Sequence, residues 1–121
     1  MFAHENEIDR FGKTQTRYWL TQGDSFGIIA RPIDAEGNVV DSSLIQKVMF
    51  KLVRPEDHII IFQKAFESYN EGKFILRGLS SETSDIPVRQ YNYEIEYTFT
   101  DGSVNTPNQW RFCIIPQGKE E

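Results

Sequence analysis

The most regular alternation of hydrophobic and polar positions in this chain spans residues 91–99. Aromatic or aliphatic residues occupy every odd position there, and asparagine, glutamate or threonine every even one. A period of two places the hydrophobic side chains on one face of a strand and the polar side chains on the other. The segment is therefore predicted to be a half-buried antiparallel strand. Asp101-Gly102 follows it and predicts a hairpin with a type I′ turn, whose two central positions both need positive φ.

Shorter segments with an extended pattern lie on both sides of this strand. Strands are predicted at residues 16–21, 25–32, 47–54, 59–66 and 73–77, with a last one ending at Ile115. Residues 59–66 fit two interpretations, because the isoleucines at 59–61 favour a strand while the spacing from Phe62 to Tyr69 also fits a helix. The strand is favoured, since the run is short for a helix and has no cap.

Seven to eight short strands at intervals of eight to twelve residues predict an all-β protein, an immunoglobulin-like antiparallel β-sandwich, with a small barrel as the alternative. Pro87 precedes Tyr91 at the start of the regular strand. This arrangement is similar to the tyrosine corner of immunoglobulin-like sandwiches, where the hydroxyl group bonds back to the preceding loop. The predicted organisation is a flexible N-terminal arm at 1–14, a sandwich domain at 15–116 and a C-terminal tail at 117–121.

The length of 121 residues suits one domain, and 39% hydrophobic residues suit a packed core. The net charge of −5, with scattered basic residues, argues against a nucleic-acid partner. The sequence has neither a membrane-spanning apolar run nor a signal peptide, so no membrane partner is expected. Cys113 is the single cysteine, which excludes an intrachain disulfide and favours synthesis and folding in the cytoplasm.

Two carboxylates on one strand are the first candidates for catalysis. Glu94 and Glu96 are two positions apart, so their Cα atoms are about 7 Å apart. A glycosidase separates its catalytic carboxylates by about 5–9 Å. The favoured interpretation is nevertheless a solvated sheet face. His58 beside Asp57 suggests a nucleophilic site, but no Gly-x-Ser-x-Gly segment accompanies them.

Metal and cofactor sites are not predicted. His4, His58 and Cys113 have no paired spacing, whereas structural zinc needs four convergent ligands. Residues 34–38 contain part of a calcium-loop pattern without its closing glutamate, so an ordinary turn is favoured. The expectation is a protein without catalysis, metal or cofactor.

An interaction surface is predicted instead, at Trp19, Met49 and Val53. Each of them points away from the hydrophobic face of its predicted strand, and exposed apolar groups on an outer face favour a protein partner. The alternative is that Trp19 packs under the N-terminal arm.

The order of turns and strands resembles the N-terminal immunoglobulin-like domain of upper baseplate proteins of tailed phages, and related small tail proteins. The resemblance covers residues 17–115 and rests on these features: Gln22-Gly23-Asp24 before the strand at 25–32, the turn at 34–37, the strand at 48–52, the turn before Gly72, the polar loop to Pro87, the strand from Tyr91, and Asp101-Gly102.

This resemblance implies a virion protein that is made in the bacterial host cytoplasm and docks, in symmetric copies, on other tail or baseplate proteins. It implies no catalysis and no cofactor. The resembling proteins often continue into a stalk, whereas this sequence ends soon after its last strand, which suggests an adaptor or decoration subunit whose arm docks on a neighbour. The alternative function is a carbohydrate-binding or adhesion module of immunoglobulin-like fold, suggested by Trp19 and the tyrosine-rich strand.

Overall fold

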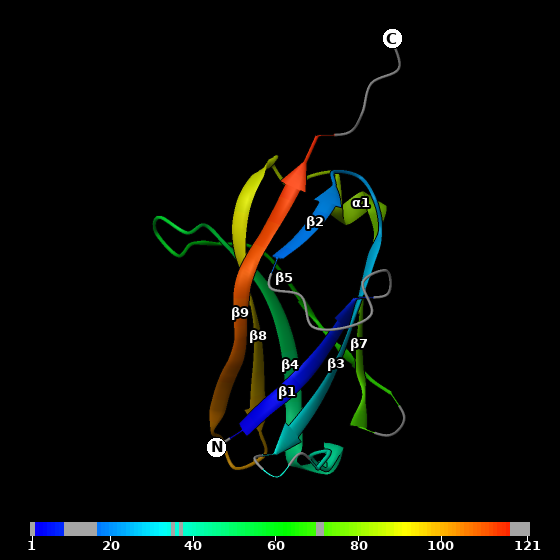
Figure 1. Ribbon diagram of the computed structural model, residues 1–121, viewed down its shortest axis with the longest axis vertical. Helices are drawn as coiled ribbons and strands as arrows, with labels where there is room; N and C mark the ends of the chain where they lie inside the picture. The colour runs from blue at the N-terminus through cyan, green and yellow to red at the C-terminus, as the bar shows by residue number, and fades with distance from the viewer. Residues whose placement is uncertain (1, 9–16, 35, 37, 70–71, 117–121) are drawn as a thin grey trace.

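The computed structural model describes residues 2–8, 17–34, 36, 38–69 and 72–116, which form two β-sheets packed face to face (Figure 1). A 3₁₀ turn, η1 (Ser42–Leu44), and one short helix, α1 (Ser80–Thr83), lie between strands. The strands are β1 (Phe2–Ile8), β2 (Arg17–Thr21), β3 (Phe26–Asp34), β4 (Ile45–Val53), β5 (Ile60–Ala65), β6 (Glu67–Ser68), β7 (Phe74–Gly78), β8 (Arg89–Phe99) and β9 (Val104–Ile115). The predicted all-β sandwich is confirmed.

The strand order is that of an immunoglobulin-like sandwich. One sheet has the order β1-β3-β7-β6 and the other β2-β9-β8-β4-β5. The first corresponds to the A-B-E-D sheet of an immunoglobulin domain, and β9-β8-β4 corresponds to its G-F-C strands. The prediction was an antiparallel sandwich, but the second sheet is mixed, because β2 runs parallel to β9.

Part of the predicted arm forms a strand. β1 pairs antiparallel with β3 over its whole length, from Phe2 opposite Asp34 to Ile8 opposite Ile28. The assignment of residues 1–14 to an arm without regular structure is therefore corrected for this stretch, while residue 1 and residues 9–14 lie outside the described part. Main-chain hydrogen bonds to the edge of β3 do not require a hydrophobic side-chain pattern, so the sequence carried no signal for this strand.

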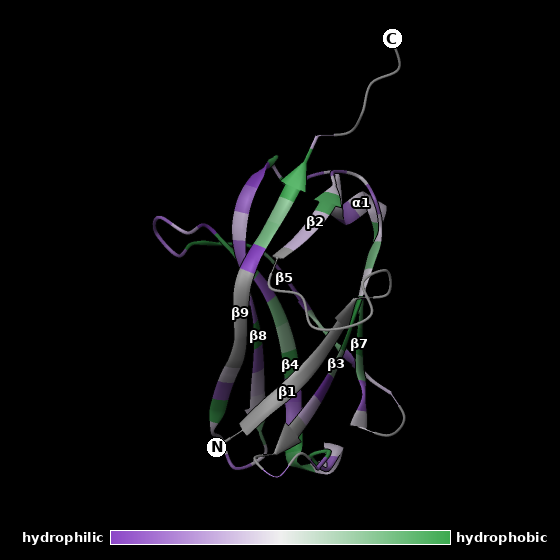
Figure 2. Cartoon of the chain, in the orientation of Figure 1, coloured by the Kyte–Doolittle hydropathy of each residue, from purple (hydrophilic) through white to green (hydrophobic). Residues whose placement is uncertain are grey.

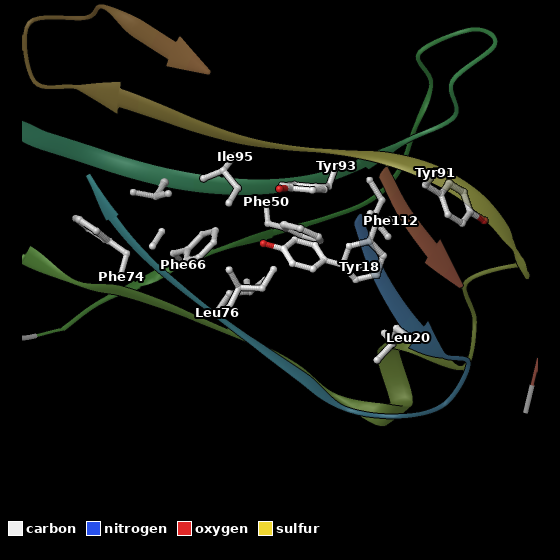
Figure 3. Packing of buried hydrophobic residues seen from close by; sticks show 14 of the residues in the cluster. Tyr18, Leu20, Phe50, Phe66, Phe74, Leu76, Tyr91, Tyr93, Ile95 and Phe112 are labelled. Carbon is white, nitrogen blue, oxygen red and sulfur yellow. The ribbon is translucent and has the colours of Figure 1, made fainter. Parts of the chain in front are cut away.

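Aromatic side chains fill the centre of the core between the sheets (Figure 3). The Phe50 ring is fully buried; its centroid lies 6.2 Å from that of Tyr93, in a stacked arrangement, and 5.7 Å from that of Phe112. The odd residues of β8, from Tyr91 to Tyr97, are all buried, as the alternation predicted. Such ring pairs add to the hydrophobic stabilisation of the core.

The connection between α1 and β8 contains the predicted tyrosine corner. The Tyr91 hydroxyl donates a hydrogen bond of 2.7 Å to the carbonyl oxygen of Pro87. Burial raises the pKa of Tyr91, so the hydroxyl stays protonated and remains a donor. The bond ties the start of β8 to the loop before it.

Replacing Tyr91 with phenylalanine is expected to lower the free energy of unfolding by about 1–2 kcal/mol, because the Pro87 carbonyl loses its donor. Urea denaturation of the purified protein measures this. Tyr69→Phe is the matched control and should change stability by less than about 0.5 kcal/mol, since Tyr69 is exposed. Equal effects of the two substitutions would contradict a role for the corner.

The β8–β9 hairpin differs from the predicted type I′ turn. The Gly102 N–H donates to the Phe99 carbonyl and the Phe99 N–H donates to the Ser103 carbonyl, each at 2.9 Å. Gly102 has φ of 91°, whereas Asp101 keeps a negative φ and its carboxylate accepts a 2.8 Å bond from the Ser103 N–H. The loop is thus a three-residue turn with one left-handed glycine, stabilised by the aspartate side chain.

One other prediction is confirmed, and the register explains the position of a proline in β9. Residues 59–66 contain β5, so the strand interpretation was right. Pro107 lies at an irregularity of β9, because the register shifts between the pairs Ile95–Asn108 and Tyr97–Asn105. A residue without a backbone donor is tolerated at such a bulge.

Candidate interaction surface

Trp19 lies on the outer face of the five-stranded sheet. Its neighbours on β2, Tyr18 and Leu20, are buried in the core, so Trp19 points the other way and is 51% exposed. The register places it beside Cys113 of β9, which lies beside Gln90 of β8. Cys113 is buried, so Trp19 lies next to a position of this face that solvent does not reach.

Two further hydrophobic residues lie in the next row of the same face. Thr21 of β2 pairs with Ile115 of β9, and Val88 precedes Arg89, which pairs with Ile114, so Val88 comes next to Ile115. Val88 is 43% exposed. Figure 2 shows hydrophobic ends of β2 and β9 side by side. We call Trp19, Val88 and Ile115, with the buried Cys113, the Trp19 patch.

The structure separates the three residues of the predicted surface. Trp19 is on β2, whereas Met49 is on β4, with β9 and β8 between them. Met49 is half-buried. Val53 is only 1% exposed, so its assignment to an exposed surface is wrong.

The cover over Val53 comes from the β4–β5 connection. The Nε2 atom of His58 lies 2.9 Å from Oε2 of Glu94 on β8. Because β4 separates β5 from β8, His58 must cross the outer face of β4, which is the face of Val53. His58 holds a φ of 63°, a left-handed conformation that costs a non-glycine residue roughly 1–2 kcal/mol.

Ion pairs hold the same connection in place. Arg89 at the start of β8 binds Glu56 through two bonds of 2.9 and 2.6 Å, and Arg54 binds Asp57. The hydrogen bond from Arg89 lowers the pKa of the Glu56 carboxyl, and that from Arg54 lowers the pKa of Asp57. Exposed pairs of this kind contribute little to stability, but a two-bond arginine pair restricts geometry.

The two glutamates considered for catalysis have separate partners. Glu94 contacts His58, while Oε2 of Glu96 lies 3.2 Å from Nζ of Lys51. His58 contacts Glu94 and not Asp57, so the nucleophilic arrangement suggested by the sequence is not assembled. These contacts favour the interpretation of a solvated, ion-paired sheet face.

Metal ligands do not gather in the described part of the chain. No group of three or more histidine, cysteine, aspartate or glutamate residues there could hold a metal ion. The side chains of His4 and Asp34 lie outside the described set. No helix among the described residues is long and apolar enough to cross a membrane.

Val88 and Ile115 were missed by the sequence analysis. Val88 belongs to no periodic segment, and Ile115 is the last residue of its strand. Only the register of β2, β9 and β8 places them on the same face as Trp19, in the next row. A further exposed hydrophobic pair, Ile59 and Ile60, lies at the other edge of this sheet.

No protein-family model matches the sequence, and a search of curated proteins finds no similar one. Solved structures are similar in fold. Native alpha-2-macroglobulin of E. coli matches with a TM-score of 0.57 and 13% identity over 93% of this chain and 6% of that one. The GspB Siglec domain matches with a TM-score of 0.56 and 14% identity, over 97% of this chain and 59% of the other.

A fibronectin(III)-like module of Clostridium thermocellum CbhA matches with a TM-score of 0.50 and 10% identity, over 92% of this chain and 96% of the other. At such identities the likeness concerns the fold. The strand order, the tyrosine corner and these matches together define the class: an immunoglobulin- or fibronectin-like β-sandwich module.

Proposed function

We propose that this chain is a non-catalytic assembly module that binds other proteins through the Trp19 patch, as an adaptor or decoration subunit of a phage tail or baseplate. The observation that carries the proposal is the half-exposed Trp19, with Ile115 and Val88 in the next row of the same sheet face. The kind of assembly comes from the resemblance to phage tail proteins in the order of strands and turns.

The patch has the composition of an interface centre. Tryptophan is enriched among residues that dominate binding energy, and aliphatic neighbours exclude water around it. The patch is built on paired strands, so little conformational entropy is lost when a partner covers it. The ion pairs of Glu94 and Glu96 on the same face favour a surface that binds over one that reacts.

Trp19→Ala is expected to weaken a complex with tail or baseplate proteins by at least about 30-fold, which corresponds to roughly 2 kcal/mol. Co-expression with tail and baseplate proteins encoded nearby, followed by purification and calorimetry, measures this. Val104→Ala is the matched control, because Val104 is 57% exposed at the start of β9 and lies outside the patch.

Two results would defeat the proposal. One is the failure of the chain to form a complex with any such protein. The other is its absence from mass spectra of purified particles of the phage that encodes it. A complex with the same affinity after Trp19→Ala would support the assembly function but exclude the Trp19 patch as its binding surface.

The exposed tryptophan also supports a second candidate, a carbohydrate-binding or adhesion module. An exposed aromatic ring can stack on a sugar, but the tyrosines of β8 that could extend such a platform are buried, Tyr93 and Tyr97 completely. A glycan array with the purified protein separates the two candidates. Binding that Trp19→Ala abolishes would favour the adhesion module, and an array without signal would remove it.

A further inference from the structure

The strand β5 is an edge of the five-stranded sheet. It pairs with β4 on one side, and within the described part of the chain no strand pairs with its other side. Ile59, just before the strand, and Ile60, its first residue, are 49% and 42% exposed. An edge strand of this composition is open to pairing with another chain unless charges, prolines or a cover protect it.

The charge that could protect this edge is directed elsewhere. Lys64 is the single charged residue of β5, and the strand has no proline. The Lys64 ammonium donates to the Arg77 carbonyl at 2.7 Å and to Oε1 of Glu82 at 2.8 Å, across the side of the sandwich. Inward-pointing charges can protect a sheet edge, but this ammonium is already paired with Glu82 and keeps that partner when a strand is added at the edge.

The hydrogen-bonding pattern defines which residues of β5 face outward. The Phe66 N–H donates to the Val48 carbonyl, so Phe66 and every second residue before it direct their backbone groups toward β4. Gln63 and Ala65 therefore direct theirs toward the free edge. Ile61 also directs its backbone groups toward the free edge. It lies at the bulge, where the pairing with β4 shifts between Leu52 and Val53.

We infer that the free edge of β5 pairs antiparallel with β5 of a second copy of this chain, on a two-fold axis at Gln63. In this register Gln63 is opposite itself and Ile61 is opposite Ala65, so every outward residue has a partner. Lys64 is opposite Phe62, which avoids the Lys64–Lys64 contact that a shift by one residue along each strand would create. Gln63 is exposed, and its amide can both donate to and accept from its symmetry mate.

The pairing joins two five-stranded sheets into one continuous sheet. Ile60, at the start of β5, then comes beside Phe66 of the second copy and loses exposed apolar surface. The contact is short and smaller than a standard stable interface, so we expect a reversible dimer with a dissociation constant on the order of 10–100 µM. The inference goes beyond the proposed function, because it requires no other virion protein.

Sedimentation equilibrium of the whole chain over a concentration series tests the inference. Gln63→Glu and Gln63→Lys each place like charges opposite each other on the axis, and each should weaken the dimer at least about tenfold. An equimolar mixture of the two variants should restore dimerisation, because opposite charges then meet. Gln63→Thr is the control that keeps the dimer.

Position 63 lies opposite Lys51 of β4, so a lysine there also repels a charge within the same chain and lowers stability. A second variant is therefore used. Gln63→Pro removes an outward N–H without removing a bond to β4, and it should give a folded monomer. Trp19→Ala should leave the dimer unchanged, so failure of this inference is distinguishable from failure of the proposed function. A wild-type chain that stays monomeric into the millimolar range would overturn the inference, as would charge variants that dimerise like the wild type.

Discussion

Replacing Phe50 with alanine is expected to lower the free energy of unfolding by about 3–5 kcal/mol. Phe50 is fully buried, and its ring packs against those of Phe26, Phe62, Tyr93 and Phe112, at centroid distances of 5.7 to 6.4 Å. The substitution removes a ring that contacts four other rings of the core. It leaves a cavity, because the surrounding strands relax only in part. Urea or thermal denaturation of the purified variant measures the loss.

The control is Leu44→Ala, which truncates an apolar side chain that is 54% exposed. That control should change the free energy of unfolding by less than about 0.5–1 kcal/mol. A loss below about 1.5 kcal/mol for Phe50→Ala would mean that the two sheets do not meet around this ring. It would also remove the physical basis for an ordered Trp19 patch on the opposite face of the same sheet.

Gly78→Ala is expected to cost about 2–3 kcal/mol, because the glycine leaves room for an aromatic ring. Phe26 pairs with Gly78 across β3 and β7, and a Cβ atom at position 78 would lie 1.9 Å from Cε1 of Phe26. The ring cannot turn aside freely, since its centroid lies 5.9 Å from that of Phe50 and 5.7 Å from that of Phe112. Denaturation by urea measures the cost.

A double-mutant cycle tests this explanation directly. Phe26→Leu removes the ring, so Gly78→Ala in that background should cost less than about 1 kcal/mol, and the two substitutions should be clearly non-additive. Additive effects would show that the glycine is needed for another reason, such as backbone conformation at the end of β7.

The two inferred contacts lie at opposite edges of one sheet. The Trp19 patch is on β2 and β9, and the edge that pairs with a second copy is β5. A two-fold dimer through β5 therefore leaves both Trp19 patches exposed at the far ends of the joined sheet. Such a dimer could bind two neighbouring proteins at once, which suits symmetric assembly.

Periodic segments were read correctly from the sequence. The alternation from Tyr91 to Phe99 predicted β8 and its buried face, because a period of two is a direct consequence of strand geometry. Pro87 and Tyr91 predicted the tyrosine corner, since this feature depends on residues only four positions apart. The outward direction of Trp19 followed from the same alternation on β2.

Features that depend on a distant partner were missed or misjudged. β1 exists through main-chain pairing with β3, which needs no hydrophobic pattern. Val53 has an outward position by alternation, yet the loop that carries His58 to Glu94 covers this part of the face. The β8–β9 loop has three residues instead of two, so Gly102 takes a positive φ and Asp101 does not.

The sequence by itself determined that this is an all-β chain with one buried face on each long strand, because the spacing of hydrophobic residues along a strand is local information. Only the tertiary structure decided which strands are neighbours, which edges stay open and which outward residues are exposed. Those properties come from contacts between residues far apart in the chain. The grouping of Trp19 with Val88 and Ile115, and the open edge of β5, are both of this kind.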